Sequence, residues 1–263
     1  MFSDDFMRAR APANLDVGVV LGGAFGAIGK HWVVFLIYTL VLFCLPYAVT
    51  QAAFLSLTPD YSTSFASLGT LWRGLLISLP NIFLIQPFFA ALIGWTVWAD
   101  SLRTQANARS AISAVGRQTI PLLLVNLLVV LAQTVGTLLL IVPGVIVSLA
   151  FWVALPACVV EGGSGRAALS RGLFLTRGQR WRLFLLAIVL GVITAGLSII
   201  FNLISLMAGF NPVHSVSPIV TGVRAATSGI GGVIGAAVAG SAYVELMRIK
   251  GGGPGSEVAE VFA

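Results

Sequence analysis

Six apolar stretches, each about as long as a bilayer is thick when coiled into a helix, occupy most of this chain. A spanning helix needs roughly 20 mostly apolar residues, and a backbone in lipid must satisfy its own hydrogen bonds. The stretches lack the alternating pattern of a membrane barrel. They predict an all-α polytopic membrane bundle with six transmembrane helices, at residues 32–57, 74–99, 119–142, 144–160, 183–208 and 225–247.

The composition leaves little polar material to coat a water-exposed surface. Hydrophobic residues make up 58% of the chain and charged residues 9%, whereas a soluble domain carries about 25% charged residues. We therefore expect lipid to surround most of the molecule. Residues 1–250 form a single membrane domain in this interpretation, and the glycine-rich segment 251–263 is expected to be a flexible cytoplasmic tail.

The basic residues gather on one side of the predicted zigzag. Every Lys and Arg except Arg73 and Arg224 falls at the termini or in the second and fourth connections. The positive-inside rule therefore places both termini in the cytoplasm. The net charge of +6 is typical of a membrane surface, and nucleic acid is excluded as a partner because no basic face carries stacking aromatics.

A threefold pattern recurs along the chain. Amphipathic, interfacial helices are predicted at 15–28, 102–115 and 166–177, and each leads to a glycine followed by basic or polar residues. We expect Gly29, Gly116 and Gly178 to adopt the left-handed conformation that ends a helix. The three helix–hairpin units would cover about 15–99, 102–160 and 164–247, related by an axis along the membrane normal.

The segment 143–184 carries the most specific motifs. It contains Pro-Gly at 143–144, Phe-Trp-Val-Ala-Leu-Pro-Ala at 151–157, Ala-Leu-Ser-Arg at 168–171, Leu-Thr-Arg-Gly at 175–178 and Arg-Trp-Arg at 180–182. This segment resembles the membrane-domain family of glycerophosphoryl diester phosphodiesterases and its stand-alone, mostly uncharacterised bacterial relatives. The resemblance implies a bacterial inner-membrane protein. It does not imply phosphodiesterase activity, because a catalytic barrel needs about 250 further residues.

Groups that could carry out catalysis are scarce. His31 and His214 lie on opposite predicted faces, and no two carboxylates share a span at helical spacing. A two-carboxylate acid–base site is therefore unsupported. We expect a protein that is not an enzyme, with no metal and no cofactor.

Two charged features remain. Glu161 and Glu245 lie near the cytoplasmic ends of spans, where we expect structural ion pairs with Arg171, Arg180 or Arg182. A basic stretch at the third interfacial helix could bind an anionic lipid headgroup or a protein partner. Its residues are Gly163, Ser164, Arg166, Arg171, Arg177, Arg180 and Arg182. The alternative is a flexible turn whose arginines only satisfy the positive-inside rule.

Small residues recur every four positions in the last span and allow helix backbones to approach closely. Gly232, Ala236 and Gly240 form one such face, and Gly231, Gly235 and Ala239 form another. Internal packing is the favoured interpretation and a homodimer contact the alternative. The sequence leaves the oligomeric state open.

These observations favour an accessory membrane protein that interacts with lipids or a protein partner. The alternative is a small transporter or channel, in which Asn81, Gln86, Asn126 and Gln133 would face a common cavity. We also expect Pro80 and Pro87 to kink the second span, with the freed carbonyls satisfied by neighbouring helices or by water.

Overall fold

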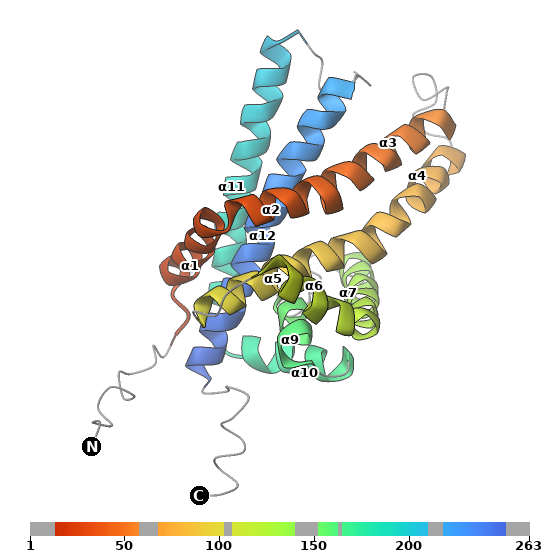
Figure 1. Cartoon of the computed structure of the whole chain (residues 1–263). Coiled ribbons are helices and arrows are strands. Elements are labelled where there is room, and N and C mark those ends of the chain that lie inside the picture. Colours follow the sequence, from red (N-terminus) through yellow and green to blue (C-terminus); the bar gives the residue numbers. More distant parts are fainter. Residues whose placement is uncertain are drawn as a thin grey trace, which may run out of the picture.

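A computed structural model describes residues 14–57, 68–102, 107–139, 152–162, 165–209 and 218–250, and every element within these ranges is helical (Figure 1). The all-α prediction is confirmed for this part of the chain. Four helical stretches are long and apolar enough to cross a membrane, or five if a bent pair counts as one span. Residues 140–151, which include the end of the predicted third span and the first part of the predicted fourth, lie outside the described residues.

The bundle contains both short helices and long apolar helical stretches. The four membrane-length stretches are Trp32–Ala53, Trp72–Ser101, Arg180–Met207 and Val220–Ile249. The helix bounds are α1 Val17–Lys30, α2 Trp32–Thr39, η2 Leu40–Cys44, α3 Leu45–Leu57, α4 Leu68–Pro80, η3 Asn81–Ile85, α5 Gln86–Ser101, α6 Ala108–Arg117, α7 Thr119–Leu139, α9 Ala154–Glu161, α10 Gly165–Thr176, α11 Arg180–Met207 and α12 Pro218–Ile249.

Both N-terminal spans contain one turn of π-helix next to a proline. The segments η2 and η3 each end two residues before a proline, Pro46 and Pro87 respectively. Proline has no N–H to continue an α-helical ladder and its ring crowds the preceding turn. A wider π-turn accommodates both effects without ending the span.

The carbonyl released by Pro87 finds a partner on another helix. A π-helical bond from the Ile82 carbonyl would reach the N–H of residue 87, which proline lacks. The side-chain amide of Asn126 on α7 instead donates to the Ile82 carbonyl at 3.1 Å. Of the two expected partners, a neighbouring helix and water, the neighbouring helix therefore satisfies this freed carbonyl.

Three elbows, the short breaks between α1 and α2, α6 and α7, and α10 and α11, share one backbone conformation. The φ and ψ angles are −112° and 26° at His31, −104° and 17° at Gln118, and −114° and 8° at Gln179. At the second elbow the chain turns by 72°. A recurring local geometry therefore joins each short helix to the apolar helix that follows it.

Glycine has a smaller part in these elbows than the sequence indicates. Helices α1 and α6 continue through Gly29 and Gly116, neither of which has a positive φ. Of the three elbow glycines, only Gly178 adopts a left-handed conformation, with φ of 86°. The prediction of a left-handed glycine at every elbow is wrong for the first two, because the residue in the break itself redirects the chain.

Helices α5, α9 and α12 lie at the centre of the bundle, where they pack against one another. A Cβ added to Gly240 would lie 3.1 Å from the Cα of Gly94, and one added to Gly94 would lie 3.3 Å from the Cβ of Pro156. Such approaches require residues without side chains. The internal-packing prediction for the small residues of α12 is confirmed at Gly240.

The three short helices surround this centre in cyclic order. Helix α1 contacts α12 and α5, α6 contacts α5 and α9, and α10 contacts α9 and α12. Away from this end, the α3–α4 and α11–α12 pairs diverge from each other (Figure 1). In the most apolar window of α12, 61% of residues are buried, against 11% in α11, so α12 is a central helix and α11 a peripheral one.

Candidate membrane-interface sites

The predicted basic surface surrounds the α10–α11 elbow, but part of it is engaged in structural contacts. Arg171 Nε donates to Glu161 Oε1 at 3.0 Å, and the Tyr243 hydroxyl donates to the same oxygen at 2.9 Å. These bonds connect α9, α10 and α12. Glu161 therefore has the expected type of partner, and Arg171 has a structural contact of its own.

Arg182 fastens the start of α1 to the third elbow. Its Nη1 donates to the Leu15 carbonyl at 2.7 Å, and the Leu15 N–H donates to Gln179 Oε1 at 3.2 Å. The Leu15 side chain is fully buried. Arg182 and Gln179 both bond to Leu15, which is far from them in the sequence. These contacts therefore stabilise the fold.

Lys250 closes the C-terminal end of α10, where helix carbonyls lack partners within the helix. Its ammonium donates to the carbonyls of Phe174 and Arg177 and lies 4.6 Å from the centroid of the Phe174 ring. Burial, together with the nearby Arg177 charge, lowers the pKa of Lys250 from its ordinary value.

Three arginines of the predicted surface are exposed and form no ion pair with any described residue: Arg166, Arg177 and Arg180. We refer to them as the elbow arginines. Trp181 beside them is 73% exposed and Phe174 is 53% exposed. Basic side chains next to exposed aromatic rings are typical of the headgroup layer of a membrane. Gly163 and Ser164, also predicted for this surface, lie outside the described residues.

Carboxylates mark the same end of all three central helices. Glu245 on α12 is buried and lies 3.6 Å from Arg248 Nη1 across one helical turn, so its partner is not one of the three arginines expected. Asp100 on α5 accepts from Lys30 and lies 3.2 Å from His31 Nε2. The sequence analysis missed this contact, although Asp100 ends its span as Glu161 ends the predicted fourth span.

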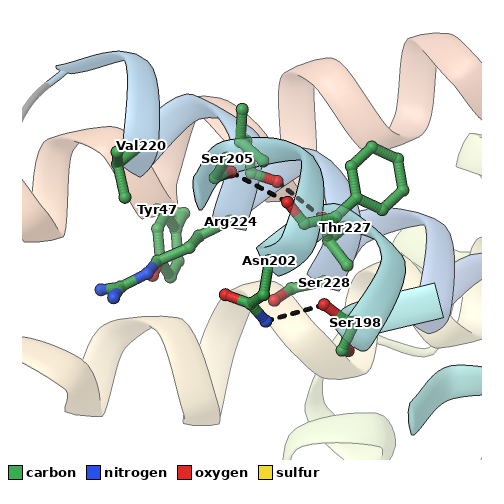
Figure 2. A pocket seen from close by; sticks show the side chains of 10 residues that line it. Tyr47, Ser198, Asn202, Ser205, Val220, Arg224, Thr227 and Ser228 are labelled. Atoms are coloured by element: carbon green, nitrogen blue, oxygen red, sulfur yellow. Dashed lines mark hydrogen bonds between the residues drawn. The ribbon is translucent and has the colours of Figure 1, made fainter. Parts of the chain in front are cut away.

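A polar cavity of about 420 Å³ lies at the opposite end, between α3, α11 and α12 (Figure 2). We refer to it as the Arg224 cavity. Its lining is rich in hydroxyl groups and contains no acidic residue: Tyr47, Ser198, Phe201, Asn202, Ser205, Val220, Val223, Arg224, Thr227 and Ser228. Two of them have a signal in the sequence: Arg224 is one of the two basic residues on this face, and Asn202 is a polar residue inside a predicted span.

Two of the four amides expected to face a common transport cavity, Asn126 and Gln86, have separate surroundings. Asn126 is bonded to the Ile82 carbonyl, whereas Gln86 lines a different cavity of about 250 Å³ with Phe43 and Trp152. The Asn126 amide therefore contributes to helix packing. Nothing in these two environments favours the transporter alternative over the accessory one.

No group of three or more His, Cys, Asp or Glu residues in the described ranges is placed to hold a metal ion. No family model, curated protein or solved structure matches this chain. The resemblance to the phosphodiesterase membrane domain therefore stays a prediction.

Proposed function

We propose that this chain is a non-enzymatic integral membrane protein whose elbow arginines bind anionic lipid headgroups at the cytoplasmic face. The main support is that Arg166, Arg177 and Arg180 are exposed and have no ion-pair partner among the described residues. The exposed Trp181 lies beside them. Each basic residue near an anionic membrane surface contributes about 1 kcal/mol. A protein partner with an acidic surface is the alternative ligand.

The proposed architecture has six spans in three helix–hairpin units. The shared elbow conformation supports it, as does the cyclic order in which α1, α6 and α10 contact the central helices. The carboxylates at the ends of α5, α9 and α12 recur once in each unit. With the elbows in the cytoplasm, the bundle would reside in a bacterial inner membrane, as the sequence resemblance implies.

The lipid proposal is tested by removing two elbow charges with Arg177→Gln and Arg180→Gln together. We expect the affinity of the purified protein for phosphatidylglycerol to fall about tenfold or more, and its affinity for phosphatidylcholine to stay unchanged. Titration of fluorescent lipid into detergent-solubilised protein measures both.

A matched control removes the same charge at the second elbow, with Arg109→Gln and Arg117→Gln, which are also exposed. This variant should retain most of the phosphatidylglycerol affinity. Equal losses in both double variants would show that bulk positive charge, and no specific surface, attracts the lipid. A change in solute flux through proteoliposomes without any change in lipid affinity would favour the transporter alternative instead.

A further inference from the structure

Two polar stripes face each other across the Arg224 cavity. Ser198, Asn202 and Ser205 recur along one side of α11, and Thr227 and Ser228 follow Arg224 by about one turn on α12 (Figure 2). Residues three, four and seven apart share one helix face. The other sides of α11 carry exposed apolar groups, including Leu203 at 54% and Met207 at 89% exposure. The polar stripe therefore points into the bundle while the rest of this helix faces lipid.

Most hydroxyl protons in the cavity are already used within the helices. Ser198 and Ser205 donate to the carbonyls four residues earlier, at 2.9 Å each, and Thr227 donates to the Val223 carbonyl at 2.8 Å. One N–H of Asn202 donates to the Ser198 carbonyl at 2.7 Å. The oxygens of these side chains retain lone pairs, so this part of the lining presents acceptors to a ligand.

Donors gather at the other part of the lining. The side chains of Arg224, Tyr47 and Ser228 make no hydrogen bond or ion pair with any residue that the structure describes. Figure 2 shows the Arg224 side chain passing the Tyr47 ring, with Asn202 and Ser228 on the far side of the cavity. Arg224 and Tyr47 thus form a cationic donor side of the cavity, whereas Ser228, which can also donate, lies on the acceptor side with Asn202.

The position of Arg224 in its helix places this charge near the membrane surface. It lies four residues after Val220, where the apolar span of α12 begins, which is about 6 Å along a helix. A guanidinium this close to a helix end can reach the headgroup layer, where a counter-charge stabilises it. A phosphate group would supply that charge and accept two parallel hydrogen bonds from the guanidinium.

We propose that the Arg224 cavity binds the headgroup of a phospholipid from the leaflet opposite the elbow arginines. The phosphate lies against Arg224 and Tyr47, and a hydroxyl or ammonium group of the headgroup donates to the Asn202 amide oxygen and the serine oxygens. The acyl chains remain in the bilayer beside the apolar faces of α11. This site is separate from the elbow surface and does not depend on it.

Native mass spectrometry of the full chain, released from micelles with phosphatidylglycerol added, tests the proposal. Arg224→Gln should weaken retention of this lipid about 10–100-fold, the effect of losing a hydrogen-bonded charge. Arg73→Gln removes the same charge from the same face on α4 and should retain the lipid. Asn202→Leu should weaken phosphatidylglycerol more than phosphatidic acid, which lacks the extra donor group.

The outcomes separate the possible ligands. Binding of glycerol 3-phosphate as tightly as phosphatidylglycerol would show a site for a soluble phosphate and overturn the lipid assignment. Equal losses in Arg224→Gln and Arg73→Gln would also overturn it. The conservative Arg224→Lys variant, with a monodisperse elution profile as evidence of folding, should retain part of the binding. Its failure to bind better than Arg224→Gln would contradict a role for the charge.

Discussion

The two ends of the bundle are built on opposite principles. At the elbow end, α5, α9 and α12 converge until Gly240 touches the backbone of Gly94, and charged groups pair with one another. At the other end, the α3–α4 and α11–α12 pairs diverge (Figure 1), and Arg224 lies in a cavity without an acidic neighbour in its lining.

Helix α12 shows both behaviours along its length. Its last third contains fully buried residues such as Ala242, Tyr243 and Leu246, whereas Arg224 and Ser228 near its start are exposed. Lipid supplies no hydrophobic drive between helices, so tight contact needs small residues and hydrogen bonds. The converging end therefore stabilises the bundle, and the diverging end is left open for a ligand.

The largest expected effect comes from adding one methyl group to the converging end. Gly240→Ala places a Cβ 3.1 Å from the Cα of Gly94 and 3.2 Å from its carbonyl oxygen. Backbone cannot move aside as a flexible side chain can, so we expect the free energy of unfolding to fall by about 1–3 kcal/mol. Titration with a denaturing detergent, followed by circular dichroism, measures this loss.

The matched control is Gly191→Ala on the peripheral α11, where nothing lies within 4 Å of the added Cβ. Alanine favours a helix over glycine by about 1 kcal/mol, so this variant should be neutral or slightly more stable. A similar loss of stability in both variants would contradict the distinction between central and peripheral helices.

A smaller effect is expected from two tyrosines at opposite ends. Tyr243→Phe removes the hydrogen bond to Glu161 from a fully buried site, and should lower the free energy of unfolding by about 0.5–1.5 kcal/mol. Tyr47→Phe, in the Arg224 cavity, should leave stability unchanged and weaken phospholipid retention. Detergent denaturation measures the change in stability, and native mass spectrometry measures lipid retention. If Tyr47→Phe lowered stability and Tyr243→Phe weakened lipid retention, the roles given to the two ends would be wrong.

Much of this organisation follows from the sequence. Local composition and spacing, which can be read from one sequence, predict three features. These are the helical fold, the approximate limits of the long apolar stretches, and the close packing of Gly240. The Asn126 contact with the π-turn was also expected in kind, since Pro87 must release a carbonyl. Each of these features has a signal within a single span, such as a proline or a repeat of small residues.

The allocation of individual charges could not be predicted in the same way. Arg180 and Arg182 have similar sequence surroundings, yet only Arg182 reaches the Leu15 carbonyl. The reason is that the start of α1 lies against the third elbow in the folded bundle. The Arg224 cavity is likewise formed by residues from α3, α11 and α12. The sequence signal for this cavity is the spacing of Ser198, Asn202 and Ser205 along one helix face. That spacing indicates a binding site only when the fold places Arg224 opposite these residues.

Labelling of single cysteines tests most directly whether the two ends lie on opposite membrane faces. With the free Cys44 and Cys158 replaced by alanine, Arg177→Cys and Ser228→Cys are each exposed to a membrane-impermeant maleimide in intact spheroplasts. We expect immediate labelling of the Ser228→Cys protein, and labelling of the Arg177→Cys protein only after the membrane is disrupted. Labelling of both in intact spheroplasts would contradict the proposed bundle.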